Sequence, residues 1–252
     1  MRLPNRLTHG QQADLVDHLD ELRLRLFVAG GAVLVASTAA YIVHGRILRV
    51  LIDALPAQHH KLITFGVAEP FTTSLKLSIV AGFLIALPVV LWQLWAFLAP
   101  ALDPKTQRSI AGFVVFAGAL MIGGVIFGDR VALPAALKFL TNYDNNLYNV
   151  QLRAADFISF AVLVLAACGA VFELPIAVLG LVRVKALTST KLRRNRRMGY
   201  LIVTIIGVAL PGVDPVTTVI ETIPLAILFE ASIWLSVLFE RRWFAPTPLA
   251  SS

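Results

Sequence analysis

Long runs of apolar residues, separated by short polar segments, dominate this chain. Six runs carry no charged residue or only one, and such runs are typical of helices that cross the hydrocarbon core of a bilayer. They cover residues 26–43, 77–98, 110–128, 157–182, 198–213 and 223–239. The pattern predicts an all-α integral membrane protein with six spans, built as one membrane domain over residues 1–240 with a short, disordered tail at 241–252.

The segments between the runs carry further signals. Residues 14–25 have leucines at helical spacing, which predicts a helix at the membrane surface that runs into the first span. Pro88 predicts a kink in the second span, because proline removes one backbone hydrogen bond. The external segments predict a short helix near residues 51–55 and an extension of the third helix over 132–140.

The last two spans are predicted to be short. Pro211 and Gly212 end the fifth run after residues 198–210, a length that gives about 20 Å of helix at 1.5 Å per residue. The hydrocarbon core is about 30 Å thick. We therefore expect the fifth and sixth helices to lie beside a thinned bilayer or to be shielded by the rest of the bundle.

Composition supports a membrane protein over a soluble one. Hydrophobic residues make up 58% of the chain and charged residues 15%, against about 25% charged in average proteins. The single cysteine, Cys168, excludes an internal disulfide and is expected to be a small packed residue. Four acidic residues precede the first run, where a cleavable signal would be basic, so we expect the first span to remain as an anchor.

The charge distribution predicts the orientation. Of the 22 Lys and Arg residues, fifteen fall before the first run, between runs two and three, between runs four and five, or after run six. This excess marks the cytoplasmic side, so both termini are expected in the cytoplasm. We interpret the net charge of +7 in this way and expect no nucleic-acid partner. The basic loop 183–197 is read first as a topology determinant and second as a site for anionic lipid.

Residues suited to chemistry are few. The motifs of serine hydrolases, zinc proteases and nucleotide-binding loops are missing from the sequence, so we expect no enzyme and no cofactor. His59 and His60 are adjacent and point apart, which disfavours a metal site. Glu173 and Glu230 lie inside apolar runs, where an ionisable residue usually faces a protein interior or a wet cavity. A small-molecule or ion transporter remains an alternative, although no repeat relates the two halves.

Six segments, in order along residues 15–235, carry motifs that resemble one family. They are His18–Leu26 (HLDELRLRL), Glu69–Phe71 (EPF), Leu91–Leu102 (LWQLWAFLAPAL), Phe172–Pro175 (FELP), Leu210–Pro215 (LPGVDP) and Ile223–Glu230 (IPLAILFE). Each motif is weak alone, but together they resemble the TatC family. TatC is the multispanning core of the twin-arginine, or Sec-independent, protein translocase, and the resemblance implies a concave, glove-like bundle.

The resemblance implies binding of signal peptides that carry an Arg-Arg pair ahead of an apolar stretch. Such a ligand needs carboxylates at the cytoplasmic surface, because guanidinium and carboxylate pair through parallel hydrogen bonds. Glu21 matches the family's carboxylate, and Asp17 and Asp20 strengthen its field. Phe97 matches an aromatic residue beside the binding site, and Arg23 is expected to orient Glu21 or meet lipid phosphate.

Two observations leave this assignment open to alternatives. Glu21 also stands four residues before Arg25, so a local ion pair on the helix surface is the competing interpretation. In addition, the family's second carboxylate, in the first cytoplasmic loop, is replaced by Thr106. We expect Asp103, in the same turn, to be the substitute.

The remaining candidates concern assembly. Glu173, Glu230 and Gln93 are expected as intramembrane polar groups that meet partner subunits. For Glu173, the competing interpretation is a protonated carboxyl that is hydrogen-bonded inside the bundle. On the external side, the assembly candidates are Glu69, Pro70, Phe71 and Asp214, with turn capping as the alternative for Asp214.

The resemblance also implies the partners and the energy source. Single-span subunits of the TatA and TatB type are expected beside the bundle, together with further copies of the chain and membrane lipids. Folded cargo would cross the cytoplasmic membrane of a prokaryote at the expense of the proton-motive force. No covalent chemistry is implied.

Overall fold

The computed structural model describes residues 15–56, 60–98, 110–143, 147, 150–183, 186–210 and 215–243. Predictions for His59, Asp103, Thr106, Asp214 and the tail lie outside these residues, as does the side chain of Asp17.

The described chain is helical throughout. The elements are α1 (Leu15–Ile42), α2 (His44–Asp53), α3 (Glu69–Leu98), α5 (Ile110–Phe127), the π-helical turn η3 (Gly128–Ala132), α6 (Leu133–Asn142), α7 (Ala154–Phe172), α8 (Leu174–Arg183), α9 (Ser189–Arg194), α10 (Arg196–Ala209) and α11 (Pro215–Trp243). Extended pairing in the described residues is limited to one isolated bridge. The predicted all-α membrane fold is therefore confirmed.

Five helical segments of the described chain are long and apolar enough to cross a membrane. They are Leu19–Ile42, Glu69–Phe97, Val114–Asn142, Ala154–Arg183 and Pro215–Glu240. The fifth predicted span corresponds to α10, which has 14 residues, or about 21 Å at 1.5 Å each. Its shortness was expected, and the count of six spans stays a prediction.

The prediction that the sixth helix is short is wrong. Helix α11 has 29 residues and continues through Pro224. It begins at Pro215, because proline suits the first turn of a helix, where its missing N–H would have no partner. At the other end, charged residues extend the helix to Trp243 beyond the apolar run.

The helix expected before the first span is present and runs into that span, because residues 15–25 are the first turns of a continuous α1. Two other elements differ from the expected ones. Helix α3 runs unbroken from Glu69 to Leu98 with Pro88 inside it. The fourth run, in contrast, divides at Glu173 into α7 and α8. Pro175, in the first turn of α8, cannot donate a backbone hydrogen bond to the turn before it, which explains the break.

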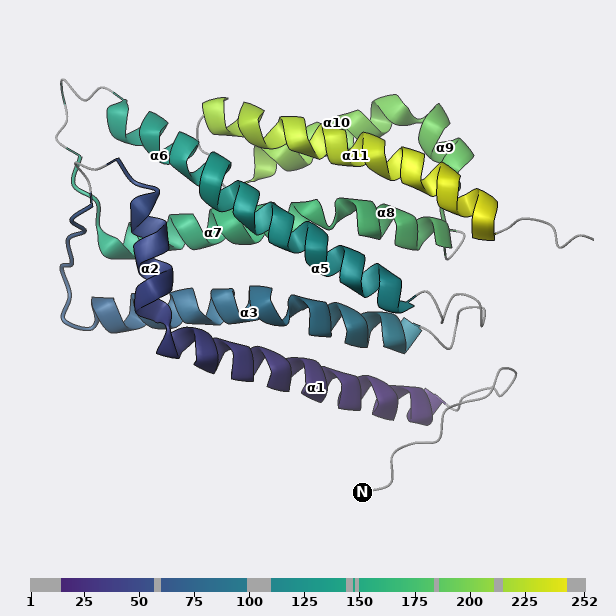
Figure 1. Cartoon of the computed structure of the whole chain (residues 1–252), viewed down its shortest axis with the longest axis horizontal. Coiled ribbons are helices and arrows are strands. Elements are labelled where there is room, and N and C mark those ends of the chain that lie inside the picture. The colour runs from purple at the N-terminus through teal and green to yellow at the C-terminus, as the bar shows by residue number, and fades with distance from the viewer. Residues whose placement is uncertain are drawn as a thin grey trace, which may run out of the picture.

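The long helices lie side by side, with α2 crossing one end of the bundle (Figure 1). Helix α1 packs along α3, and α3 in turn contacts α5 and α7. A Cβ on Gly82 of α3 would overlap the backbone of Ser37 on α1, so glycine allows this close approach. Helix α11 packs on α8 and α10.

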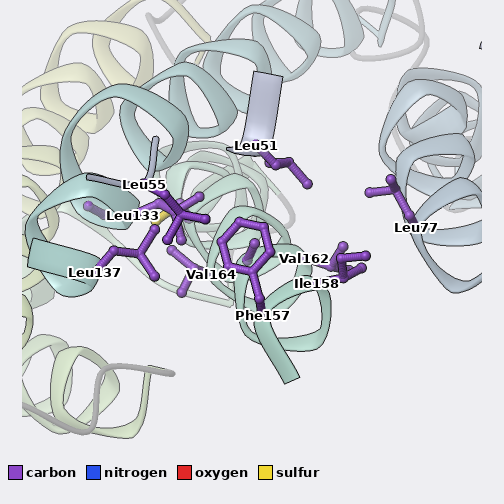
Figure 2. Packing of buried hydrophobic residues seen from close by; sticks show 12 residues of the cluster. Leu51, Leu55, Leu77, Leu133, Leu137, Phe157, Ile158, Val162 and Val164 are labelled. Carbon is purple, nitrogen blue, oxygen red and sulfur yellow. The ribbon is translucent and has the colours of Figure 1, made fainter. Parts of the chain in front are cut away.

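The largest apolar core lies where α2 and α6 cover α3 and α7. Figure 2 shows its side chains, with the ring of Phe157 near the centre of the labelled group and Leu51 above it. A second cluster forms around Trp95 between α3, α5 and α8, and a third around Phe229 between α10 and α11. The predicted helix near residues 51–55 thus exists as α2, and its Leu51 helps to close this end of the core.

Gly124 tests the packing of α5 against α7. A Cβ at this position would lie 2.6 Å from the carbonyl oxygen of Cys168 and 2.8 Å from Cβ of Phe172. Gly124→Ala should therefore destabilise the protein by about 1–3 kcal/mol through overpacking. The measurement is the thermal unfolding midpoint in detergent. Gly30→Ala is the control, because a Cβ there meets nothing within 4 Å, and equal midpoints for both variants would contradict this packing.

Candidate functional site

One end of the bundle gathers most of the described positive charge. It is formed by the start of α1, the ends of α3, α8 and α11, and helix α9 (Figure 1). We call it the basic end, because α9 and the first turn of α10 alone carry Lys191, Arg193, Arg194, Arg196 and Arg197. Glu21, in the first turns of α1, and Phe97, in the last turn of α3, belong to the same end of the bundle.

Glu21 is part of a polar chain that joins α1 to α3. Arg25 donates from Nε to Oε1 of Glu21 at 3.0 Å, and its Nη2 donates to the same oxygen. The third guanidinium nitrogen, Nη1, donates to Oε1 of Gln93 at 3.3 Å. The side chains of Glu21 and Arg25 are 20% and 24% exposed. The carboxylate therefore holds a guanidinium at a site that solvent can reach.

This geometry settles one point that the sequence left open. The local ion pair between Glu21 and Arg25 is present, and it includes Gln93, which lies 68 residues beyond Arg25. Gln93 is thus a partner of Arg25, and its use as a docking group stays a prediction. The ion pair does not exclude ligand binding, because a guanidinium of another chain is the natural competitor for the same carboxylate.

The other candidates at the basic end have separate surroundings. Asp20 is exposed, and the guanidinium of Arg23 lies 5.7 Å from the ring centroid of Phe27, as in a cation–π contact. Phe97 is half-buried in the last turn of α3. Trp95, which the sequence did not single out, is buried against Gly180 of α8 and fixes this end of α3.

Glu173 occupies the break between α7 and α8. Its N–H donates to the carbonyl of Ala170 at 3.2 Å. Both carboxyl oxygens are buried, and neither has a hydrogen-bond partner among the described residues. The alternative in which Glu173 is hydrogen-bonded inside the bundle is therefore not what the described part of the chain contains. A buried polar group in this state is costly, and a role of Glu173 in docking a partner subunit stays a prediction.

Glu230 differs from Glu173, because the chain itself satisfies it. Arg196 of α10 forms an ion pair with Oε1 at 3.0 Å. The hydroxyl of Tyr200 donates to Oε2 at 2.9 Å, and Nε1 of Trp234 donates to Oε1 at 3.0 Å. This cluster joins α10 to α11 on an exposed surface of the bundle, and a docking role for Glu230 stays a prediction.

Glu221 is a buried acid that the sequence analysis missed. It lies on α11 with only 1% exposure, next to the fully buried Thr217. The apolar run was taken to begin at residue 223, so Glu221 was left outside the span. Pro215 was the available signal, because proline often occupies the first position of a helix and would have moved the start of α11 ahead of Glu221.

Glu69 organises the opposite end of the bundle. It is 7% exposed and accepts the backbone N–H groups of Phe65, Gly66 and Ala155 at 3.1–3.3 Å. Nε and Nη2 of Arg153 donate to its two oxygens at 3.0 and 3.2 Å. Glu69 both accepts a hydrogen bond from Arg153 and attracts its positive charge, and so raises the pKa of the guanidinium.

Backbone pairing supports the same junction between the two segments that were predicted to be external. The N–H of Ile63 donates to the carbonyl of Leu152 at 3.0 Å, and the N–H of Ala154 donates to the carbonyl of Ile63 at 2.8 Å. Pro70 and Phe71 remain exposed, with Phe71 at 58%. Of the external candidates, Glu69 thus has an internal structural role, whereas Phe71 presents an apolar ring to the surroundings.

No group of His, Cys, Asp and Glu in the described part of the chain is arranged to hold a metal ion.

Comparisons with known proteins give a consistent result. Residues 17–224 match the family model of the Sec-independent protein translocase protein TatC. The TatC protein of Carboxydothermus hydrogenoformans is 31% identical over 92% of this chain and 96% of its own length. That of Aquifex aeolicus is 33% identical over 90% and 96%. A crystal structure of the twin arginine translocase receptor TatC, 32% identical, superposes with a TM-score of 0.76 and covers 87% of this chain and 99% of that one.

Removing Glu69 tests the junction at the opposite end. Glu69→Ala leaves three N–H groups and one guanidinium without their acceptor, so the thermal unfolding midpoint in detergent should fall. Asp156→Ala, which removes an exposed acid nearby, should change it little. In a double-mutant cycle with Arg153→Ala, the combined loss should be clearly smaller than the sum of the single losses. Additive losses would show that the ion pair does not stabilise the fold.

Proposed function

The chain belongs to the TatC family of Sec-independent protein translocase proteins, and on this premise we propose that its basic end is the receptor site for twin-arginine signal peptides. As a TatC protein it is a multispanning component of the Tat translocase in a bacterial membrane, and it is not an enzyme. The family therefore supports protein export over the small-molecule transporter that the sequence left as an alternative.

One observation carries the proposal, namely the guanidinium already bound at Glu21. Arg25 places two nitrogens on one carboxylate oxygen while the pair remains partly exposed. The arrangement is what an arginine of a signal peptide would form at the same carboxylate, because the donor group is identical. Arg25 thus occupies the carboxylate that we propose an arginine of the ligand binds.

Binding is then an exchange of one guanidinium for another. The incoming arginine takes the place of Arg25 on Glu21, and Gln93 keeps a hydrogen bond to the displaced side chain. Such an exchange costs little, because the carboxylate is never left without a donor. Asp20, and on the same helix Asp17, would add negative potential for the second arginine.

The apolar part of the signal is expected beside the arginine site. Phe97 would pack on it or stack on an arginine. Asp103 is proposed as the substitute for the loop carboxylate that Thr106 replaces, and Arg23 is proposed to meet lipid phosphate or to orient Glu21. No bond is made or broken, so the chain acts by recognition alone.

Assembly with other Tat subunits follows from the family. We place both termini in the cytoplasm and count α10 as the short fifth of six spans within one membrane domain over residues 1–240. Single-span partners of the TatA and TatB type would present a polar group to Glu173, whose carboxyl has no hydrogen-bond partner among the described residues. Gln93 and Glu230 are secondary docking candidates. Phe71, beside Pro70, and Asp214 are proposed for contacts between copies on the outer side, and the proton-motive force would drive transport.

Substitution of Glu21 tests the receptor site. Glu21→Gln should weaken binding of a peptide with an intact Arg-Arg pair by about 10- to 100-fold, because a charged hydrogen bond contributes about 1.5–3 kcal/mol. Binding to the purified protein is measured by fluorescence anisotropy, and site-specific crosslinking from Phe97 reports the same complex in membranes. Asp156→Asn, far from the basic end, is the control. Unchanged binding by Glu21→Gln would refute the site.

Substitution of Arg25 tests the exchange. An internal competitor lowers the affinity of every ligand by the same factor, and a helical ion pair worth 0.5–1 kcal/mol corresponds to about three- to sixfold. Arg25→Gln should therefore tighten binding of Arg-Arg and Lys-Lys peptides by the same factor and leave their ratio unchanged. Arg25→Lys keeps the positive charge but loses the paired guanidinium donors, so its affinity for both peptides should lie between those of the wild type and Arg25→Gln. Weaker binding by Arg25→Gln would mean that Arg25 positions Glu21 for the ligand.

A further inference from the structure

A cavity lies at the basic end between α9 and the last turns of α11. Its volume is about 680 Å³. The lining residues come from two short stretches of the chain: Ser189, Thr190, Arg193, Arg194, Val237 and Glu240. The cavity is separate from the polar chain of Glu21, because α1 and α9 stand at opposite edges of the bundle (Figure 1).

The walls of this cavity are held in place by contacts of their own. The side chain of Thr188 accepts the N–H of Lys191 at 3.3 Å and caps α9. Leu192 packs against the apolar cluster around Phe229. The carboxylate of Glu240 accepts the N–H of Ser189 at 2.8 Å, which joins α9 to α11. Helix α9 therefore presents Arg193 and Arg194 from a fixed base.

The two arginines of the cavity are available for a ligand. Both are exposed, and neither is paired with a carboxylate in the described part of the chain. The nearby Arg196 differs, because it is bound to Glu230. With two guanidinium groups and the single carboxylate of Glu240, the lining carries a net charge of +1. It therefore matches a ligand with one negative charge.

The position of the cavity identifies the kind of ligand. Val237 belongs to the apolar run of α11, and Glu240 is the first charged residue beyond that run. The cavity thus spans the level where the hydrocarbon core gives way to headgroups. Guanidinium groups bind phosphate through parallel hydrogen bonds, and the hydroxyls of Ser189 and Thr190 are further donors. Arginines that served only to orient the chain would need no preformed cavity.

We propose that this cavity binds the phosphate of an anionic phospholipid whose headgroup carries hydroxyls, as phosphatidylglycerol does. Arg193 and Arg194 hold the phosphodiester, which has a single negative charge. A headgroup hydroxyl donates to Glu240, and Val237 contacts the glycerol and the first acyl carbons. The bound lipid joins α9 to the end of α11. This inference does not depend on the signal-peptide site.

Native mass spectrometry of the full-length protein tests the proposal. The protein is released from detergent with phosphatidylglycerol or phosphatidylcholine of the same acyl chains. The wild type should retain phosphatidylglycerol preferentially. Arg193→Gln together with Arg194→Gln should reduce this retention about tenfold or more, as expected for the loss of charged hydrogen bonds. The conservative pair Arg193→Lys and Arg194→Lys, which keeps the charge, should retain an intermediate amount.

The matched control removes two charges from the same segment outside the cavity. Lys191→Gln together with Arg197→Gln should bind phosphatidylglycerol as the wild type does. Equal losses in the control and in the arginine pair would reduce the effect to general surface charge and overturn the proposal, as would equal retention of the two lipids by the wild type. Displacement of the lipid by millimolar inorganic phosphate would overturn the assignment to a lipid and leave a phosphate site.

Discussion

Every charge that this chain carries near the membrane must find a partner or reach a helix end, because the hydrocarbon core offers neither water nor counterions. Three of the described ion pairs obey this constraint and also take part in contacts between separate segments. Glu69 and Arg153 join the two external segments. Glu230 and Arg196 join α10 to α11. Arg25 extends the pair with Glu21 to Gln93 on α3. The contacts that neutralise these charges therefore also join separate segments of the bundle.

Glu173 is the exception that gives the constraint its functional meaning. Its oxygens are buried without a partner among the described residues, at the one place where a membrane-length helical segment is interrupted by proline. A carboxyl in this state raises the energy of the isolated chain. In our proposal, a polar group from a neighbouring subunit would lower that energy, and the cost to the isolated chain would then favour assembly. Glu21 is the opposite case, because it already has an internal partner. In our proposal, an incoming arginine replaces Arg25 on this carboxylate.

Local patterns in the sequence were sufficient to predict most of the helices but not the contacts between residues far apart in the chain. Hydropathy placed the apolar runs, and the spacing of four residues already indicated the pair of Glu21 and Arg25. The pair of Glu69 and Arg153 spans 84 residues, and no periodicity reports a contact at that distance in the chain. The length of α11 was missed for a different reason. A charged residue was taken as the end of the span, whereas α11 continues through Glu221, whose side chain is buried.

The basic end poses an electrostatic question, since the proposed receptor site for two arginines stands among many cations. Screening at physiological salt removes most of the repulsion beyond about 8 Å, and the separation of α1 from α9 across the bundle keeps the largest group of cations away from Glu21 (Figure 1). Near the membrane, screening is weaker, because part of the path runs through a medium of low dielectric constant. A lipid phosphate held by Arg193 and Arg194 would neutralise one of these charges locally. The same cations can then orient the chain in the membrane without opposing a doubly positive ligand at Glu21.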